Sequence, residues 1–392
     1  MTQEDLQQLQ QVAGGLPAFE RVGVFSPRRE AEGRLWPKLT ALPRWRWDLD
    51  RPGRRRFDLL VACNVFMFAS DAARWFRHVF ACSRYFLLLD VVRRRRSSDS
   101  EFFDDRLRFK VGNEGPRVEP SFDLATLGDR LLGYHTFFGG ANEFDDKPLH
   151  FIALFRGDLA EPVLRIDDYP TGIRPILPDL SPLHEVLRKV EQRALPYHLG
   201  IVPALLTDEM FQFLGSLQHI VPVVHGYDHA YPKYAPILEA KGDPYNERTV
   251  GTFNEFKGQP YEEILAKLRR GRQVLEDRLG RPVTDYIPPC NRGNRKTGRA
   301  LRAAGYHRYF SETRIRGCAV PGIRSDFYGR SSEYDYTRAA DVVTLHTTWE
   351  WDLVRKGETR ALDRLLDHLA ARRQTARAQG AALGALVAAL PS

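Results

Sequence analysis

Continuous apolar runs of strand length alternate with amphipathic segments along much of this chain. In the first third, the runs at residues 57–65 and 85–92 are typical of strands that are buried on both faces of a parallel sheet. Between them, residues 70–80 have apolar side chains at helical spacing behind a Ser70 cap. The order strand, helix, strand predicts a βαβ unit.

A second alternation begins after a break near residues 155–162. Strand-like runs occur at residues 163–166, 197–202, 222–224, 285–287, 307–310 and 342–345. The clearest helix spans residues 261–279 and is stopped by Gly280, and another opens at Ser181 with Pro182 in the first helical position. Repeated βα units predict an α/β fold with a small (β/α) barrel, in which functional groups gather at the carboxyl ends of the strands.

The composition narrows the class of protein. The chain has 392 residues, of which 43% are apolar, so it can build packed cores and is not a disordered tail. Its 58 basic and 50 acidic residues give a net charge of +8, and arginines cluster at residues 51–56 and 93–96. These runs are explained either by contact with phosphate groups or by a solvated charged loop. Nucleic-acid binding is not expected, because no recognisable reading module accompanies them.

The sequence gives no sign of a membrane span or a secretory leader. No stretch approaches the roughly 18 apolar residues that a span needs, and residues 1–8 lack the basic start and apolar core of a signal peptide. The four cysteines, Cys63, Cys82, Cys290 and Cys318, are isolated from one another, and we expect reduced thiols. These observations predict a cytoplasmic protein without a transmembrane segment.

Three strand ends of the second part carry chemistry. Asp167 and Asp168 close one strand, His225 and His229 follow another, and His346 closes the last. Each has an ordinary explanation alone: a turn or cap for the aspartates, a half-buried core residue for His346, and chance for the histidine pair. In one parallel barrel, however, all three would open onto the same face. Independent accidents would not be expected to converge there.

Such a cluster can support hydrolysis. One carboxylate and two histidines make a three-ligand site with open positions for water, as in catalytic zinc centres. A second carboxylate can take the proton of the bound water, and a protonated histidine can donate to a departing amine. Adjacent residues of an extended strand point to opposite sides, so Asp167 and Asp168 need a strand end or turn, such as Pro170 and Gly172 would provide, to face one cavity.

These residues resemble the motifs of the polysaccharide deacetylases, the NodB-homology domains of carbohydrate esterase family 4, in the same order over about residues 161–355. The resemblance implies that Asp167 is the catalytic base and that Asp168, His225 and His229 bind a divalent metal. It also implies that His346 is the general acid and that the main-chain N–H of Cys290 helps to bind the oxyanion. Zinc is the expected metal, with cobalt, nickel or manganese as alternatives.

The sequence departs from the family pattern at three positions. Ile287 stands where the family has the arginine that steadies the base, so Asp167 must be oriented by another group, with Arg165, Arg292 and Arg295 as candidates. Cys290 replaces a tyrosine, and Gly226 stands where serine or threonine is usual. These changes indicate a divergent branch with a different substrate or weakened catalysis.

Further residues could grip a sugar ring by hydrogen bonding or stacking, and their ordinary explanation is loop polarity or aromatic core packing. They are Asn254, Glu255, Asn291, Trp349 and Trp351. In the first part, residues 47–48, 57–65 and 85–90 resemble the later strands of a Rossmann-like S-adenosylmethionine methyltransferase, but no glycine-rich cofactor loop follows a convincing first strand. We therefore expect a partial, degenerate domain that docks partners or positions substrate.

The sequence predicts three regions and one leading function. The regions are a degenerate Rossmann-like domain at 1–155, a deacetylase-like barrel at 161–358 and a helical extension at 359–392, with one or two helices in 360–390. The leading hypothesis is a metal-dependent enzyme that removes an N-acetyl group from a free, nucleotide-linked or lipid-linked sugar. Glycan-assembly proteins are its expected partners. The rivals are an inactive scaffold or glycan-binding protein in such an assembly, and a metal hydrolase acting on another amide or ester. Self-association is left open.

Overall fold

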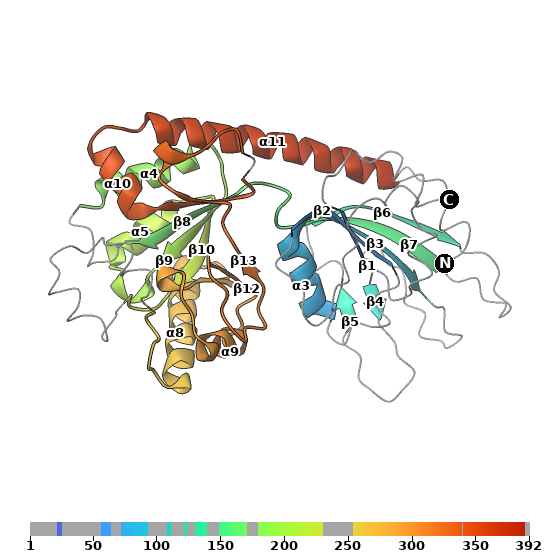
Figure 1. Ribbon diagram of the computed structural model, residues 1–392, viewed down its shortest axis with the longest axis horizontal. Helices are drawn as coiled ribbons and strands as arrows, with labels where there is room; N and C mark the ends of the chain where they lie inside the picture. The colour runs from blue at the N-terminus through green and yellow to red at the C-terminus, as the bar shows by residue number, and fades with distance from the viewer. Residues whose placement is uncertain are drawn as a thin grey trace. The chain divides into compact units, whose positions relative to one another are not determined.

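The structure is a computed structural model that describes residues 22–25, 56–63, 72–92, 108–110, 121–123, 130–138, 149–170, 179–229, 254–338 and 340–388. The chain forms two compact units (Figure 1): unit 1 comprises Met1–Glu161 and Thr375–Ser392, and unit 2 comprises Pro162–Gln374. This grouping divides the helical C-terminal segment between both units, whereas the sequence set it apart as a third region. The Ser70 cap, Gly172, residues 47–48, the arginine run at 93–96 and all but Arg56 of the run at 51–56 lie outside the described residues.

Unit 1 contains a mixed sheet with the strand order β1-β2-β3-β7-β6. The strands are β1 (Val22–Phe25), β2 (Phe57–Cys63), β3 (Ser83–Val92), β6 (Leu131–Phe138) and β7 (Leu149–Arg156). The first three run parallel, and β7 is antiparallel to both of its neighbours. Two short strands, β4 (Arg108–Lys110) and β5 (Ser121–Asp123), form a separate antiparallel pair.

Helix α3 (Ala72–Cys82) connects β2 to β3, so the βαβ unit predicted from the sequence is confirmed. Its apolar face packs on the sheet through Phe76 and Phe80, which meet Phe86 and Phe155 with ring centroids 6.0 to 6.3 Å apart. All four rings are buried, and clustered aromatic rings contribute strongly to a core of this size. The resemblance of this unit to a methyltransferase stays a prediction.

Unit 2 is built on a curled sheet of eight parallel strands in the order β13-β12-β11-β10-β9-β8-β15-β14. The strands are β8 (Val163–Tyr169), β9 (Tyr197–Ile201), β10 (Ile220–His225), β11 (Asp285–Ile287), β12 (Arg308–Phe310), β13 (Gly322–Ile323), β14 (Phe327–Gly329) and β15 (Val342–His346). The α/β fold class with a distorted, barrel-like parallel sheet is therefore confirmed. The described sheet has two edges, β13 and β14, rather than a closed ring.

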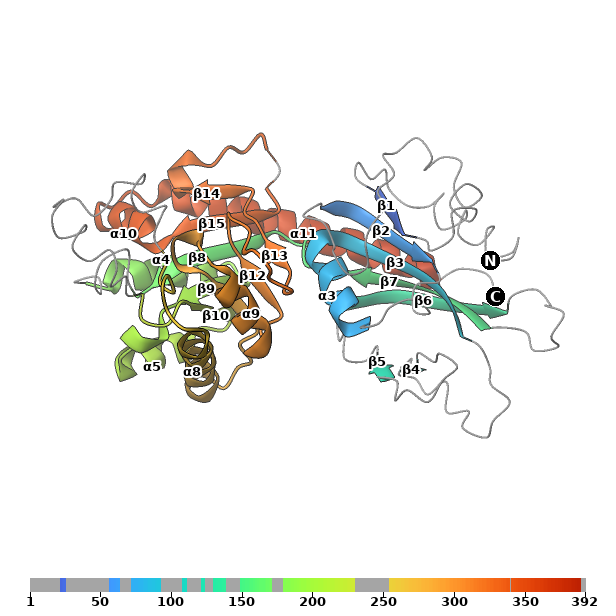
Figure 2. The ribbon, with the colours of Figure 1, turned by 60° about the horizontal axis from the view of Figure 1, so that its bottom comes forward.

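Helices lie around the outside of this sheet (Figures 1 and 2). They are α4 (Ser181–Glu191), α5 (Asp208–Ser216), α8 (Tyr261–Leu279), α9 (Arg295–Ala303) and α10 (Thr347–Arg355), with short 3-10 turns η4 (Pro203–Leu205), η5 (Pro289–Asn291) and η6 (Ser331–Glu333). The long α11 (Arg360–Ala388) contributes its first residues to unit 2 and those from Thr375 on to unit 1. Helix α8 has the predicted bounds, because Gly280 ends it in the left-handed conformation at φ 63°. Helix α4 has Leu180 as its N-cap, which makes Pro182 the second helical residue.

The strand order places the predicted site residues on one edge of the sheet. Strand β8 lies between β9 and β15, and His346 of β15 is in register with Asp167 of β8. His225, the last residue of β10, is in register with Ile287 of β11. Parallel strands present their carboxyl ends together, so these residues share one rim. Within the described part of the chain, no helix combines the length and apolar character that a membrane crossing requires.

Candidate metal centre and active site

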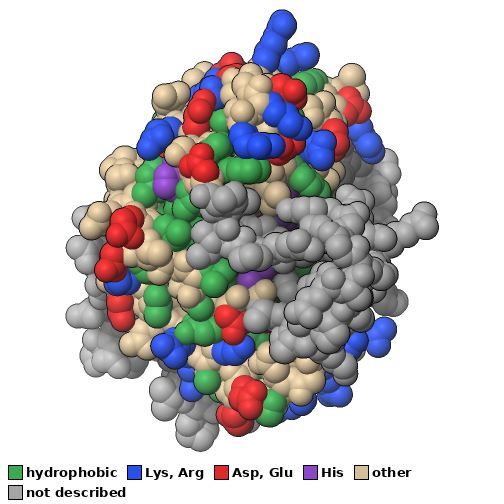
Figure 3. Space-filling view, turned by 90° about the vertical axis from the view of Figure 1, so that its left-hand side faces the viewer, with side chains coloured by type: hydrophobic (Ala, Val, Ile, Leu, Met, Phe, Trp, Pro, Cys, Tyr) green, Lys and Arg blue, Asp and Glu red, His purple; other side chains and the backbone are tan. Residues whose placement is uncertain are grey.

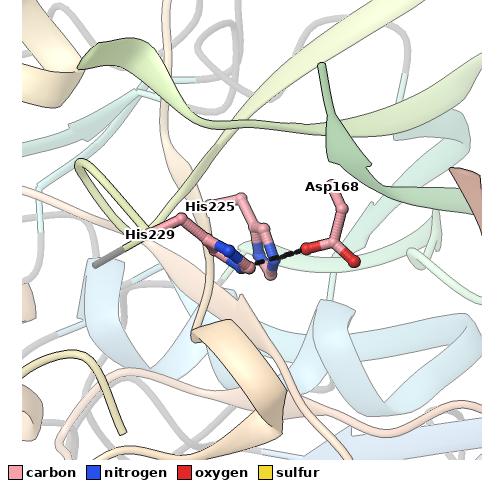
Figure 4. A group of neighbouring side chains, drawn as sticks. All are labelled: Asp168, His225 and His229. Atoms are coloured by element: carbon pink, nitrogen blue, oxygen red, sulfur yellow. Dashed lines mark hydrogen bonds and ion pairs between the residues drawn. The ribbon is translucent and has the colours of Figure 1, made fainter. Parts of the chain in front are cut away.

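The three predicted metal ligands converge at this rim. Asp168, His225 and His229 are buried, and each offers one ligand atom within 4.8 Å of the others. His229 Nε2 lies 3.1 Å from Asp168 Oδ1, and His225 Nε2 contacts the same oxygen. Figure 4 shows both imidazole rings directed at the carboxylate. The structure therefore brings together side chains that are up to 61 positions apart in the sequence, counting from Asp168 to His229 (229 − 168 = 61).

An irregularity in β8 explains how Asp168 reaches this site. Ile166 pairs with Leu199 and Tyr169 pairs with Ile201, so three steps along β8 face two steps along β9. The extra residue is a β-bulge, which re-aims a side chain. Asp168 has φ 68°, in the left-handed region. The predicted need for a break between the two aspartates is met within the strand itself.

The backbone around His225 fixes its ring. Its Nδ1 lies 3.2 Å from the carbonyl oxygen of Ile287 on the neighbouring strand, which leaves Nε2 facing Asp168. Metal-binding histidines usually have their second nitrogen held in this way. Gly200 of β9 lies between the strands that carry Asp167 and His225. A Cβ added at Gly200 would lie 3.4 Å from the Asp167 Cα and 3.4 Å from the His225 Cβ.

Glu255 supports the loop that carries His229. Its side chain is buried, and its carboxylate accepts hydrogen bonds from the backbone N–H of Tyr227 at 3.0 Å and of Asp228 at 3.4 Å. Burial, with the nearby charge of Asp228, raises the pKa of Glu255 well above its usual range. Gly226 has φ 67°, and a Cβ there would lie 1.9 Å from Glu255 Oε2. Glu255 therefore fills the space that a side chain at position 226 would need.

Asp167 is held by Arg165, two residues earlier on the same strand. Arg165 Nε donates to Asp167 Oδ1 at 2.6 Å, and its Nη2 donates to Oδ2, which makes a two-point ion pair. The guanidinium is fully buried. Burial lowers the pKa of Arg165, but the charge of Asp167 outweighs burial and raises the pKa above its ordinary value. Arg165 Nη2 also donates to Asn291 Oδ1 at 3.2 Å. Of the three arginines that the sequence offered as partners for Asp167, Arg165 occupies that place.

His346 faces Asp168 from the opposite side. Its Nε2 contacts Asp168 Oδ2, and Thr347 Oγ1 donates to the Asp168 carbonyl oxygen at 3.1 Å. Burial lowers the pKa of His346, but the charges of Asp168 and Asp167 outweigh burial and raise the pKa above its ordinary value. For Asp168, burial raises the pKa, and the imidazoles of His346 and His225 outweigh it and hold the pKa well below its ordinary range.

Left-handed backbone is concentrated at this rim. Among the described residues, five that are not glycine have positive φ, and four of them are predicted site residues: Asp168, His229, Cys290 and Asn291. Such conformations cost about 1–3 kcal/mol each and cluster at functional sites. Cys290 has φ 52° and ψ 27° in the short turn η5 after β11. This turn presents the backbone that the resemblance assigns to the oxyanion.

The residues predicted to grip a sugar are in different situations. Trp349 is half-buried on α10, with its ring 4.9 Å from that of His346. Asn291 accepts hydrogen bonds from Arg165, and Asn254 accepts one from the backbone N–H of Phe256 at 3.0 Å. Glu255 is buried beneath the His229 loop.

Sequence reasoning missed three residues near the rim: Gly200, Thr347 and Tyr328. Tyr328 is 37% exposed as a residue, and its ring packs edge to face on that of Trp349 with centroids 5.8 Å apart. A glycine inside an apolar strand is a signal that could have identified Gly200. Tyr328 and Thr347 carry no comparable signal. In Figure 3, histidine side chains reach the surface among hydrophobic ones on one face of the molecule.

The donor atoms fit a divalent transition metal. A carboxylate oxygen and two imidazole nitrogens are the ligands that zinc takes at catalytic centres, and cobalt, nickel and manganese accept similar sets. The anchored Nδ1 of His225 and the burial of Asp168 and His229 are consistent with this assignment. Asp168, His225 and His229 are therefore the residues that would hold the ion.

Comparisons with known proteins give distant likenesses. No protein-family model and no curated protein matches the chain. A family 4 carbohydrate esterase from Streptomyces lividans, solved with acetate, is 10% identical with a TM-score of 0.32, over 56% of this chain and 88% of that one. A family 4 acetyl xylan esterase from Clostridium thermocellum, solved with a cobalt ion, is 10% identical with a TM-score of 0.33, over 55% and 84%. A family 4 pseudoenzyme from Bacillus anthracis is 12% identical with a TM-score of 0.32, over 53% and 61%. At such values the likenesses carry no argument, so the chemistry is argued from this chain's own residues.

Proposed function

We propose that this protein is a metal-dependent hydrolase that removes an N-acetyl group from a sugar or glycan intermediate. The observation that carries the proposal is the joint placement of six buried side chains: Asp168, His225 and His229 within ligand distance of each other, with the Asp167–Arg165 pair and His346 beside them. A structural histidine cluster would not need a carboxylate that a buried arginine holds in one orientation.

Each side chain has a distinct role in the proposed reaction. A divalent ion bound there would lower the pKa of a water molecule to about 7 and polarise the acetyl carbonyl. Asp167, with its carboxylate oriented by Arg165, would accept the proton of the attacking water. The Cys290 N–H would donate to the oxygen that becomes negative, and His346 would protonate the departing amine. The products would be acetate and a free amino sugar.

The direct test is acetate release. The purified full chain would be loaded separately with zinc, cobalt, nickel and manganese and incubated with N-acetylated sugars, their nucleotide conjugates and other acetyl amides and esters. Release from N-acetyl sugars is the expected result. Release only from other amides or esters would assign the same site to a different hydrolase, and absence of release with every metal would overturn the proposal.

A metal-content measurement separates this proposal from an inactive scaffold. Elemental analysis of the purified chain, followed by titration with zinc, should give one ion per chain, and Asp168→Ala should abolish it. A wild-type chain that takes up no metal would instead favour a scaffold in a glycan-assembly complex. A cytoplasmic location and association with other glycan-assembly proteins stay predictions from the sequence.

A further inference from the structure

A pocket of about 740 Å³ opens among the loops that follow β11 and β12. Its lining includes four arginines, the N-cap residue of α9 and a threonine: Arg292, Arg295, Arg314, Arg316, Asn294 and Thr313. We call it the arginine pocket. It lies in unit 2 and is formed by residues that directly follow the Cys290–Asn291 turn and β12.

Three of the four pocket arginines have no carboxylate partner among the described residues. Arg295, Arg314 and Arg316 are exposed, and none of them forms an ion pair with a carboxylate in the described ranges. The acidic residue closest in sequence, Glu312, is paired with Arg324 at 3.4 Å. Each guanidinium offers five N–H donors in a planar fork that matches phosphate oxygens.

The start of α9 adds to this charge. Asn294 caps the helix through a hydrogen bond from the backbone N–H of Thr297 at 2.9 Å, and the first turn contains no acidic residue. The amino end of a helix carries about half a positive charge from its aligned peptide dipoles. Fixed dipole and arginine charges therefore have the same sign at this pocket.

Hydrogen bonds connect the pocket to the catalytic rim. The carbonyl oxygen of Asn291 accepts from Ser311 Oγ at 3.0 Å and from the hydroxyl of Thr313 in the pocket wall. The side-chain oxygen of Asn291 accepts from Arg165, the partner of Asp167. One residue thus touches both the group that orients the proposed base and the wall of the arginine pocket.

The positive charge and the volume of the arginine pocket favour a diphosphate over a single carboxylate or a lone phosphate as its ligand. A single carboxylate needs one arginine fork, whereas the three arginines without a carboxylate partner in the described ranges would leave most of their charge unpaired around it. A diphosphate diester carries about two negative charges and several acceptor oxygens, each suited to two-point pairing with arginine. The volume of about 740 Å³ also exceeds what a lone phosphate group would fill.

We propose that the arginine pocket binds the diphosphate of an activated N-acetyl sugar, so that the substrate is a sugar diphosphate ester rather than a free sugar. This inference rests on the deacetylase function proposed above. Nucleotide-linked and lipid-linked sugars share the diphosphate, and the experiment below distinguishes them. The acetamido group would lie at the metal rim and the diphosphate in the pocket.

Binding is tested without turnover. The full chain is stripped of metal and exchanged into chelator-free buffer, so that inorganic pyrophosphate cannot bind through an ion, and binding is measured by calorimetry. The pocket variant is Arg314→Gln with Arg316→Gln. The control, Arg299→Gln with Arg302→Gln, removes the same charge from exposed positions of α9 outside the pocket lining. We expect pyrophosphate affinity to fall about tenfold for each pocket arginine removed, and to change little in the control. Equal affinity in both variants would overturn the inference.

Turnover then separates the two proposals. The metal-loaded chain is given a free N-acetylhexosamine, its nucleoside diphosphate ester and a short polyprenyl diphosphate ester. The pocket variant should raise KM for the diphosphate esters and reduce their advantage over the free sugar, and the ester with the larger kcat/KM identifies the source. Equal kcat/KM for free and diphosphate-linked sugars would reject the proposal that the pocket binds substrate, but it would not contradict the proposed deacetylase activity. A third outcome is that the pocket variant loses pyrophosphate binding while no substrate releases acetate. This outcome would support the anion-binding pocket and reject the deacetylase activity.

Discussion

Arg165 and Asp167 form a buried two-point ion pair across a single intervening residue of β8. Side chains at positions i and i+2 of a strand point to the same face, so the strand itself supplies the partner. Ile287, the position where the resemblance would place an arginine beside the base, is a buried apolar residue of β11. In this chain the described partner of Asp167 is Arg165.

This relationship predicts the behaviour of Arg165 variants. Arg165→Gln leaves a buried carboxylate without its partner and should destabilise the protein by about 3–5 kcal/mol. Arg165→Lys keeps the charge without the fork and should recover part of the stability. The double change Arg165→Gln with Asp167→Asn should restore stability but not activity, as measured by thermal unfolding and acetate release. A double variant no more stable than Arg165→Gln would show that the two side chains are not coupled.

Neutralising Asp167 should separate catalysis from metal binding. Asp167→Asn preserves shape and leaves Asp168, His225 and His229 in place, so bound zinc should be unchanged. Loss of the proton acceptor should lower kcat by about 10²–10⁴-fold. The matched change Asp168→Asn should instead lower zinc content, as elemental analysis would report. Full activity in the Asp167 variant would reject its role as base.

Gly226 should not tolerate a serine side chain. Gly226→Ser places a Cβ in contact with Glu255 Oε2 at a left-handed position, which should cost about 1–3 kcal/mol and weaken zinc affinity through His225 and His229. Gly215→Ala is the control, because a Cβ in that exposed helical position meets nothing within 4 Å. The control should gain about 0.4–1 kcal/mol. A neutral Gly226→Ser variant would mean that Glu255 moves aside freely.

Metal removal should lower stability by simple linkage. An ion that binds only the folded chain adds about 2.7 kcal/mol at one hundred times its Kd. Stripping the metal should therefore lower Tm, and zinc titration should restore it in the wild type but not in His225→Ala. An unchanged Tm on zinc addition, with no zinc retained, would contradict a metal centre.

Asp363 should make stability depend on acid pH. Burial raises its pKa, but hydrogen bonding from Lys189 and the nearby charges outweigh burial and lower the pKa below its ordinary value. The pairing of Asp363 with Lys189 and Arg193 therefore contributes stability above the unfolded pKa of about 3.9, which is lost as pH falls through the folded value. Asp363→Asn should cost about 0.2–1 kcal/mol at pH near 7.

The same comparison at pH near 3 completes that test. The cost of Asp363→Asn should shrink progressively as the pH falls toward 3 and below, because the wild-type carboxyl becomes protonated there. Asp277→Asn, at an exposed aspartate with no ion pair among the described side chains, should show no such trend. A cost that stays constant from neutral to acid pH would reject the electrostatic explanation.

Elements with strong end signals could be predicted from the sequence, and weak ones could not. Helix α8 was predicted at both ends because Gly280 stops it. Strands β13 and β14 are two and three residues long, too short for an alternation to be recognised. Helix α10 was missed because Thr347 and its aromatic and β-branched neighbours favour a strand, yet the helix starts directly after His346.

For the candidate site, the convergence of the side chains could be predicted, but their supporting contacts could not. Asp168, His225 and His229 follow strands that the apolar pattern identifies, so their convergence could be predicted. Sequence alone left Arg165 as one of three arginine partners, because only the packed strand shows which guanidinium reaches Asp167. Glu255 was assigned to substrate, but its contact with the backbone at Tyr227 joins residues 28 positions apart. No local pattern reports a contact of that kind.

The bulge in β8 places the side chains of Asp167 and Asp168, two residues of the same type, in different surroundings. One aspartate is paired with a guanidinium, while its neighbour is turned toward three imidazoles. The difference resides in one additional backbone step, since the side chains themselves are the same. Inserting or deleting a single residue there would exchange or merge the two environments without changing which side chains the site contains. Alignments of related chains should therefore compare the length of this strand as carefully as its two aspartates.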